Sequence, residues 1–461
     1  MHAIEELADF VVGHREGSLP QAVRESAALL ISDLIGAAAA GLHSSLATAA
    51  RAAAAELYGS GTAAVWLTGE SLSIAGAAMA NAAAASALDI DDGHRGSAGH
   101  PGAGIIPAAL SVGQSINATD VRILDAIALG YDVALRVASS RPAATIDTYS
   151  SGRWVGYGAA AAVGRLLGLD SRQMAHAIAI AGAEGPIVFS RGTSRYLGST
   201  VKEGIPSAVV AGLTGAFRAR AGATGPLDLL DDQDRFARSI LTEGLGATWQ
   251  LQQCYLKPYA CCRYMHAAID AILAMRQPGR PIVSLRIETF PQGLRLPNAR
   301  APQTLEGAQY SYYFSCALAA VHGAEALQPV DPDRLNDPAV MDLADRIDLA
   351  AHDDFADSFP QRTPCRVIID MGDGPRSLTV LDPVGDVANP MSRVQVTEKF
   401  RRISAANIKI ERQNEILAAL EGLLEQGFGP LFAVLTEPRP ILGSRQSNNQ
   451  QRGIWDENHV I

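Results

Sequence analysis

Short runs of alanine limit the kind of fold this chain can adopt. Residues 37–40 and 82–85 are uninterrupted alanine, and 48% of the 461 residues are hydrophobic although only 6% are aromatic. Alanine is the best helix former, and its small side chain lets neighbouring helices approach closely. Residues 152–169 mix alanine with glycine but lack the spacing of a phosphate-binding loop, so they also indicate close helix packing. We therefore expect a mostly helical protein.

The sequence pattern changes near residue 277. Residues 281–290 alternate apolar and polar side chains and are rich in β-branched residues, which predicts a strand. Residues 366–371 and 378–381 flank a Gly-Asp-Gly turn and predict a β-hairpin. Between these strands we expect a helix over residues 305–323 and acidic helical segments over residues 342–356.

These patterns predict a mostly α fold with an α+β lid. The large all-helical domain is expected to comprise residues 1–276 and 395–440, and the smaller lid domain residues 277–394. Residues 441–461 are expected to form a polar C-terminal tail. A chain of this length has room for two or three domains with a large core.

Charge and cysteine content exclude several functional classes. The net charge of −10 argues against a nucleic-acid-binding protein, which would carry a basic stripe. The acidic start of the chain does not predict a signal peptide, and no long uncharged apolar run predicts a membrane span. The five cysteines lack metal-site spacing and are expected to be reduced thiols of a cytoplasmic protein.

The densest group of reactive side chains lies within residues 86–104. The group consists of Asp89, Asp91, Asp92, His94, Arg95 and His100. Glycines and a proline after Asp92 rule out a continuous helix, so these side chains are expected on a loop between two buried elements. Catalytic groups are often found on such loops. If the preceding helix continues through the first part of the stretch, Asp89 and Asp92 share one of its faces.

Lysine is rare in this chain. There are four lysines against 34 arginines, so a lysine that is retained can supply something arginine cannot, such as loss of a proton at accessible pH. Lys202 and Lys257 are the lysines that we expect to be functional. Lys399 and Lys409 lie in a charged helical stretch, where we expect ordinary lysines without a special role.

Four motifs together resemble the MmgE/PrpD family, which includes 2-methylcitrate dehydratase, cis-aconitate decarboxylase and iminodisuccinate epimerase. They are Asp89-Ile-Asp-Asp92 with His100-Pro101, Lys202-Glu-Gly204 with Gly225-Pro226, Lys257-Pro258 with Cys262 and His266, and Asn389-Pro-Met-Ser392 with Lys399-Phe400. Each motif is modest alone, but their order and spacing over residues 3–435 are specific.

The resemblance implies a fold, a site and partners. It implies a helical domain built from both ends of the chain, with an α+β lid inserted between them. It implies an active site at the domain interface that needs no cofactor or metal, usually in a homodimer. The expected partner is a small anionic di- or tricarboxylate substrate, with no nucleic acid and no membrane.

Three departures from the family's pattern bear on the reaction. Gly93 stands where dehydratase and decarboxylase members often have threonine, and one residue is inserted later in the same loop. Arg153-Trp154 stands where those members often have an aromatic–histidine pair. Phe314 falls on a tyrosine position, with Tyr313 one residue away. These changes remove groups that could protonate a leaving hydroxyl or a carbanion.

An epimerase expels nothing and needs fewer such groups. We therefore expect an isomerase that epimerises iminodisuccinate without a cofactor. The alternative is a lyase, either a 2-methylcitrate-type dehydratase or a cis-aconitate-type decarboxylase.

The shared chemistry of the family would form or quench a carbanion next to a carboxylate. His100 is the expected base, because histidine changes its protonation near neutral pH. Lys202 and Lys257 are expected to stabilise carboxylates, or one of them acts as the acid on the opposite face. Tyr313 is the other choice for that second group.

The remaining site residues are expected to bind or orient. Asp89 and Asp92 would orient a histidine or a lysine, alongside His94. Arg95 and Arg263 suit bidentate binding of a substrate carboxylate, unless they form structural ion pairs. The last of these residues is His266, which we expect either near the substrate or in the core.

Two other classes of function stay open at this stage. Asp91, Asp92, His94 and His100 could hold a divalent cation, although their spacing matches no standard metal motif. A non-catalytic protein of the same fold that binds a ligand is the other alternative.

Overall fold

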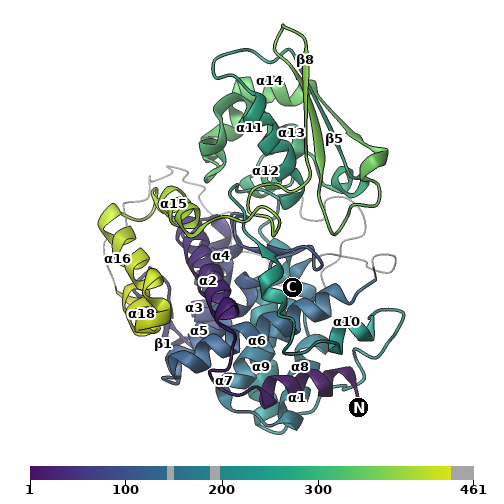
Figure 1. Cartoon of the computed structure of the whole chain (residues 1–461). Coiled ribbons are helices and arrows are strands. Elements are labelled where there is room, and N and C mark those ends of the chain that lie inside the picture. The colour runs from purple at the N-terminus through teal and green to yellow at the C-terminus, as the bar shows by residue number, and fades with distance from the viewer. Residues whose placement is uncertain (143–149, 187–197, 438–461) are drawn as a thin grey trace, which may run out of the picture.

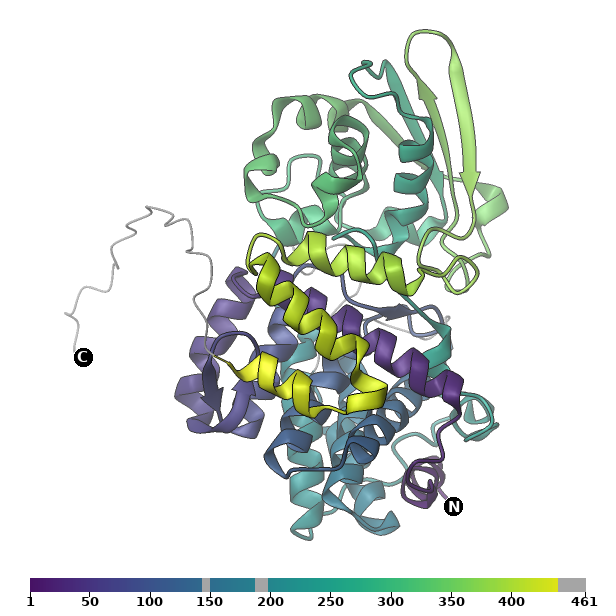
Figure 2. The ribbon, with the colours of Figure 1, turned by 60° about the vertical axis from the view of Figure 1, so that its left-hand side comes forward.

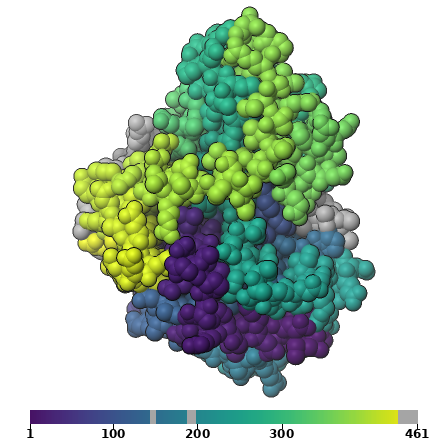
Figure 3. Space-filling model, viewed as in Figure 1, coloured from purple at the N-terminus to yellow at the C-terminus, as the bar shows by residue number. Residues whose placement is uncertain are grey.

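The computed structural model describes residues 1–142, 150–186 and 198–437. These residues form a large helical lobe and a smaller lobe of helices and one four-stranded sheet (Figure 1). The fold is therefore mostly helical with a small α+β part, as predicted. The space-filling view shows the smaller lobe standing on the larger one, with the C-terminal helices on the outside of the junction (Figure 3).

The first part of the chain supplies most helices of the large lobe. In chain order they are α1 (Ala3–Gly13), α2 (Gln21–Gly41), α3 (Ser45–Tyr58), α4 (Ile74–Ser86), α5 (Gly102–Ser115), α6 (Asp120–Ser139), α7 (Val155–Leu167), α8 (Ser171–Ala183), α9 (Ile205–Arg220) and α10 (Arg238–Thr242). Two short antiparallel pairs accompany them: β1 (Ser60–Val65) with β2 (Glu70–Leu72), and β3 (Gly93–His94) with β4 (Cys254–Tyr255).

Small residues let these helices touch backbone to backbone. A Cβ atom on Gly158 of α7 would lie 2.3 Å from the carbonyl oxygen of Gly130 on α6. All four alanines of residues 82–85 in α4 are buried in the core. The close packing predicted from the alanine and glycine pattern is thus confirmed, since larger side chains at these points would push the helices apart.

The C-terminal helices return to the large lobe. They are α15 (Arg393–Ser404), α16 (Ile410–Glu421), α17 (Leu423–Gln426) and α18 (Gly429–Thr436). Ser392 caps α15, because its side chain accepts a hydrogen bond from the backbone N–H of Gln395. Helix α15 packs on α2, and Figure 2 shows it crossing between the two lobes. Both ends of the chain therefore build the large lobe.

The small lobe carries one mixed sheet. Its strands are β5 (Ser284–Thr289), β6 (Ile347–Ala351), β7 (Cys365–Asp370) and β8 (Pro375–Val380), in the order β6-β5-β7-β8. Its main helices are α11 (His266–Met275), α12 (Leu305–Gln309), α13 (Tyr312–His322) and α14 (Pro338–Arg346). Helix α11 packs on β7 and α13, so the small lobe includes residues before 277, the predicted start of the lid domain. The predicted strand at 281–290 and the predicted hairpin are confirmed as β5 and as β7 with β8.

The helical prediction for residues 342–356 is only half right. Helix α14 ends at Arg346, and the next five residues form β6, which pairs in parallel with β5. This pairing is non-local, because the partner strand lies about 60 residues earlier, so it leaves no short-range signal in an acidic segment.

The single helix predicted over residues 305–323 is also wrong. The chain breaks between α12 and α13 at Tyr310 and Ser311. The Ser311 side chain accepts a hydrogen bond from the backbone N–H of Phe314 at 3.1 Å, so Ser311 starts a new helix as its N-cap. The break directs Tyr310 toward the large lobe, where its hydroxyl takes part in the site described below.

No single helix in the described ranges is long and apolar enough to cross a membrane. Helices α2 and α3 have the necessary length and composition only as a pair, and they are bent by 91° to each other. The polar tail predicted for residues 441–461 lies outside the described residues.

Candidate active site

The loop after α4 brings three aspartates to the junction of the lobes. Helix α4 ends at Ser86, and Asp89 adopts a left-handed backbone with φ of 54°. Asp89 and Asp92 therefore do not share a helix face, contrary to the conditional expectation from their spacing. This conformation is uncommon for residues other than glycine, although aspartate tolerates it better than most, and residues held in it cluster at functional sites.

Lys399 on α15 binds the backbone of this loop. Its Nζ donates to the Ile90 carbonyl oxygen at 2.7 Å and to Asp33 Oδ1 at 2.5 Å, and the residue is 4% exposed. The expectation that Lys399 has no special role is therefore wrong. A helix from the C-terminal end of the chain thus fixes the loop that carries the acidic residues.

Asp89 is the centre of a buried cluster of charges. Its carboxylate is in ion-pair contact with Lys202, with Lys257 Nζ at 3.0 Å and with His100 Nε2 at 3.3 Å. Asp91 contacts the other nitrogen of the imidazole, with Oδ2 at 3.3 Å from His100 Nδ1. The structure thus brings together four residues singled out from the sequence, namely Asp89, His100, Lys202 and Lys257.

The surroundings of His100 keep it protonated. Burial alone would lower its pKa, but the carboxylates of Asp91 and Asp89 outweigh burial and raise the pKa of His100 to about 10. The same cations hold the pKa of Asp89 well below its usual range, against the effect of burial. In the resting state His100 is therefore an imidazolium with a proton to give, and not the free base expected from the sequence.

This charge state makes a prediction for the pH dependence of turnover. If protonated His100 donates a proton to the substrate, kcat/KM should stay level through pH 6.5 and fall as the pH rises through about 10. Asp91→Asn should move this alkaline limb to lower pH, because it removes a carboxylate that stabilises the imidazolium. A limb near pH 6.5 in the unaltered protein would contradict the assignment.

A turn with left-handed backbone angles places Lys202 in the charge cluster. Lys202, Glu203 and Gly204 form the 3-10 turn η2, with φ of 42°, 58° and 74°. Glu203 Oε2 accepts hydrogen bonds from the backbone N–H of Ser151 at 2.8 Å and from its hydroxyl at 2.7 Å. The Ser151 Oγ in turn accepts the His100 backbone N–H at 2.8 Å. Ser151 therefore ties the turn of Lys202 to the loop of His100.

The small lobe adds two residues that the sequence analysis missed. Lys202 Nζ donates to the Tyr310 hydroxyl at 3.0 Å and lies 3.4 Å from Gln309 Oε1. The Gln309 side chain donates to the Ala87 carbonyl oxygen at 3.0 Å across the junction. Tyr313, the predicted second acid, instead stacks under Arg300, whose guanidinium carbon lies 3.8 Å from the ring centre.

The serine that follows Tyr310 is the sequence feature that could have indicated its position. Ser311 is a good helix N-cap, so the residue before it was a candidate for a turn and not for a helix face.

Both arginines expected to bind a substrate carboxylate are already engaged with protein groups. Arg95 donates from Nε to Asp386 Oδ2 at 3.0 Å, and Arg263 donates from Nη2 to the same oxygen at 3.1 Å. Both guanidiniums also lie over the ring of Tyr255, at 4.9 and 4.8 Å from its centre. The structure therefore places Arg95 and Arg263 in a structural ion-pair network beside the cluster.

The other two expected histidines lie outside the charge cluster. Burial lowers the pKa of His94 to about 4, and its Nδ1 accepts the Ser97 backbone N–H at 3.2 Å. His266 is fully buried, its pKa lies well below the usual value because of burial and then Arg263, and its Nε2 donates to the Cys261 carbonyl oxygen at 3.1 Å. Both imidazoles are neutral, and each forms a hydrogen bond with the backbone of its own segment.

Asp92 points away from the cluster and has an unusual pKa. Its Oδ1 accepts the Gly102 N–H at 3.0 Å, and its Oδ2 accepts the Tyr131 hydroxyl at 3.0 Å. Burial, followed by the nearby charges of Asp91 and Asp33, raises the pKa of Asp92 to about 7.

This pKa predicts a slope in stability. Because the folded state binds a proton more tightly than the unfolded state, stability contributed at Asp92 is lost as the pH rises from about 4 to about 7. The loss is about 4 kcal/mol for a shift of this size. About 3 kcal/mol of this loss falls between pH 5 and pH 8, and Asp92→Asn should remove it, measured by urea unfolding at these two pH values. The exposed control Asp357→Asn should keep it, and an unchanged slope in Asp92→Asn would contradict the prediction.

Three positions that depart from the family's pattern, 93, 154 and 314, are closed off by neighbouring side chains or are buried. A Cβ at position 93 would lie 2.4 Å from the ring of Tyr255, so that ring fills the space of a larger residue. Phe314 is completely buried in the small lobe, and Trp154 is 1% exposed. None of these three positions presents a hydroxyl or imidazole group to His100.

Within residues 1–142, 150–186 and 198–437, no group of three or more His, Cys, Asp or Glu side chains has the arrangement of a metal site. The alternative set of Asp91, Asp92, His94 and His100 is not brought together as ligands, because His94 faces its own loop. All five cysteines are free thiols, as predicted.

The fold and the site define a two-domain helical protein with a buried cluster of acid–base groups at the junction of its domains. The chain belongs to the MmgE/PrpD family: the MmgE/PrpD N-terminal domain matches residues 5–246, and the MmgE/PrpD C-terminal domain matches residues 259–423. Members of this family are enzymes.

Curated relatives are similar over most of their length. A cis-aconitate decarboxylase of Aspergillus terreus is 26% identical over 415 residues, which cover 80% of this chain and 83% of that protein. A cis-aconitate decarboxylase-like protein of Aspergillus oryzae is 24% identical over 378 residues, 74% of this chain and 77% of the relative.

Proposed function

We propose that this protein is a cofactor-independent enzyme that moves a proton at a carbon next to a carboxylate of a small polycarboxylate. The observation that carries the proposal is the His100 imidazolium, held between Asp89 and Asp91 and beside two buried lysines. A carbanion next to a carboxylate is high in energy, so it needs fixed cations around it and a proton donor within reach.

The charge balance of the cluster supports an anionic substrate. Protonated His100, Lys202 and Lys257 carry three positive charges against the two negative charges of Asp89 and Asp91. Burial would lower the pKa of Lys257, but the two carboxylates outweigh it and raise that pKa. The Lys257 ammonium is fully buried, and its Nζ lies 3.0 Å from Asp89 Oδ2. An ammonium has three N–H groups, so one contact with Asp89 leaves donors that a substrate carboxylate could use.

Lys202 is the proposed second proton-transfer group. The Tyr310 hydroxyl lies 3.0 Å from Lys202 Nζ and 3.4 Å from Glu203 Oε1. These contacts connect Lys202 through Tyr310 to the partly exposed Glu203 carboxylate, which gives a path for a proton exchanged between Lys202 and the substrate carbon.

Epimerisation of iminodisuccinate is the reaction that we propose first. It needs one donor and one acceptor of a proton and no group to protonate a leaving hydroxyl. His100 and Lys202 would supply this pair. The residues at positions 93 and 314, glycine and phenylalanine, supply no hydroxyl of their own that could protonate a leaving group.

Decarboxylation is the second candidate, and the relatives named above favour it. A cis-aconitate-type decarboxylation leaves a carbanion that needs a single proton, and the His100 imidazolium could supply it. A 2-methylcitrate-type dehydration would also have to protonate the departing hydroxyl.

NMR of the purified protein with three substrates separates these reactions. Iminodisuccinate stereoisomers should interconvert if the first proposal holds, whereas cis-aconitate should lose carbon dioxide if the second does. A new alkene signal from 2-methylcitrate would identify a dehydratase. Absence of turnover with all three, and with a wider panel of di- and tricarboxylates, would favour a non-catalytic binding protein.

We also propose that the protein works as a homodimer in the cytoplasm. The dimer is inferred from the resemblance to the family, and the compartment from five thiols that remain unpaired. Light scattering of the purified protein tests the first point.

A further inference from the structure

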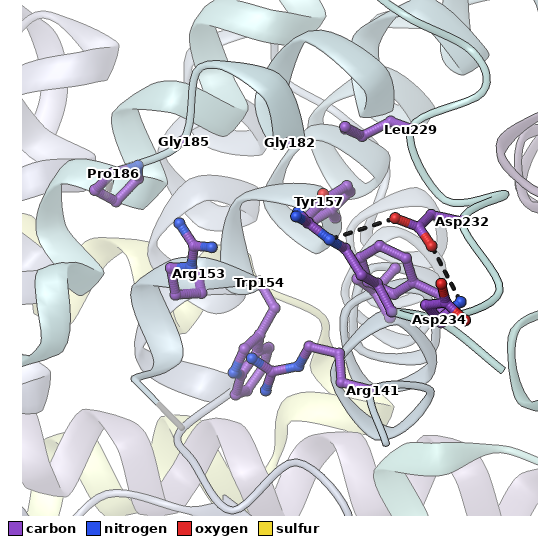
Figure 4. Close-up of a pocket in the computed structure, with 13 residues that line it drawn as sticks. Arg141, Arg153, Trp154, Tyr157, Gly182, Gly185, Pro186, Leu229, Asp232 and Asp234 are labelled. Atoms are coloured by element: carbon purple, nitrogen blue, oxygen red, sulfur yellow. Dashed lines mark hydrogen bonds and ion pairs between the residues drawn. The ribbon is translucent and has the colours of Figure 1, made fainter. Parts of the chain in front are cut away.

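A cavity lies in the large lobe, apart from the charge cluster. It has a volume of about 610 Å³ and is bordered by the end of α6, the start of α7, the end of α8 and residues 229–236 (Figure 4). Neither His100 nor Lys202 nor Lys257 lines it. This volume is in the range of pockets that hold small molecules.

The wall of this cavity contains a buried hydrogen-bond donor without an acceptor. Trp154 lines the cavity and is 1% exposed, and its indole Nε1 has no hydrogen-bond partner within the described part of the chain. Leaving a buried N–H unsatisfied costs about 1–3 kcal/mol. A ligand that supplies an acceptor to Trp154 would recover this energy.

Guanidinium groups surround the same space. Arg141, Arg153 and Arg235 line the cavity, against two carboxylates, Asp232 and Asp234. Arg235 is paired with Asp232, with Nε and Oδ2 3.3 Å apart. In Figure 4 the two aspartates lie on one side of the cavity and Arg153 lies on the other. The side away from the aspartates is therefore positive.

Tyr157 lines the cavity together with Arg141 and Arg153. Burial raises the pKa of Tyr157 to about 12, and the charges of Arg153 and Arg141 oppose this rise. Trp154 is also the N-cap of helix α7, so the positive end of the helix dipole is at the cavity.

We propose that this cavity binds a small molecule through a carboxylate or phosphate group, held by Arg141, Arg153 and the indole N–H of Trp154. Guanidinium forks bind both kinds of group bidentately, and an indole N–H can only donate, so the ligand must present acceptors. The 3-10 turn η1 (Ser151–Arg153) carries Arg153 as well as Ser151, which binds the His100 amide. A bound anion would therefore fix the segment that also holds the His100 loop.

Fluorine NMR of protein labelled with 5-fluorotryptophan tests the proposal. The chain has four tryptophans, and single Trp→Phe variants assign their signals. Inorganic phosphate and tricarballylate are titrated separately at constant ionic strength. We expect the Trp154 signal to move saturably with at least one of them, and the tighter of the two identifies the chemical class. Trp249 is a matched control, because its Nε1 is also buried and unpartnered but does not line the cavity.

Arginine variants separate this cavity from the active site. Arg141→Met combined with Arg153→Met should weaken the binding by about tenfold or more. The exposed control Arg172→Met, on α8, should leave it unchanged. The proposal is overturned if neither anion moves the Trp154 signal, if Trp249 moves equally, or if the double variant binds as tightly as the unaltered protein. Because the readout is binding, it does not depend on the reaction proposed above.

Discussion

Replacing His100 with glutamine is expected to lower kcat by about 10²–10⁴-fold, the usual contribution of a positioned acid or base. Glutamine can still donate hydrogen bonds toward Asp89 and Asp91, but it has no proton to give to a carbanion. KM should change only a few-fold, because the two lysine ammoniums remain. Steady-state kinetics with the substrate identified by NMR measures both constants.

His94 provides the matched control for this change. It lies on the same loop and is 4% exposed, but it is neutral and bonded to Ser97. His94→Gln should therefore affect stability more than turnover. If His100→Gln keeps normal turnover, or if a folded His94→Gln variant loses it to the same extent, the role of His100 is refuted.

Replacing Asp89 with asparagine is expected to cost both activity and stability. The Asp89 carboxylate is 1% exposed and is shared by Lys202, Lys257 and His100. Asparagine leaves three buried cations facing the single charge of Asp91. Breaking a buried ion pair by removing one partner costs about 3–5 kcal/mol, and we expect a loss of unfolding free energy of this size. Urea unfolding at pH 7 measures it.

A second substitution shows whether electrostatics is the cause. Lys202→Met in the Asp89→Asn background removes one of the uncompensated cations, so the double variant should regain part of the lost stability. Additive losses would show that the residues do not act through their charges. An Asp89→Asn variant as stable as the unaltered protein would contradict the charge balance described for the cluster.

Local patterns predicted much of the fold. The alanine-rich helices, the strand β5 and the hairpin of β7 and β8 follow from periodicity and turn residues, which act over a few positions. Strand β6 could not be predicted in this way, because its pairing partner β5 is distant in the sequence. The burial of Lys399 likewise depends on how α15 docks on α2, and not on the charged helix in which it lies.

The sequence predicted most of the residues that form the candidate site, but it did not predict their protonation states. The motifs pointed to His100, Lys202 and Lys257, which the structure brings around Asp89. The protonation of His100 depends on its distances to Asp89 and Asp91 in the folded protein, so a sequence motif cannot predict it. Tyr310 was missed because its place depends on the helix break at Ser311 and on the docking of the small lobe.

The central claim is that His100 transfers a proton at a carbon next to a carboxylate. The most direct test is to run the reaction in deuterium oxide and follow that carbon of the substrate by NMR. The unaltered protein should place deuterium on it, and His100→Gln should reduce the rate of incorporation by about the same 10²–10⁴-fold as turnover. Turnover without deuterium at that carbon, or incorporation at an unchanged rate in His100→Gln, would contradict the claim.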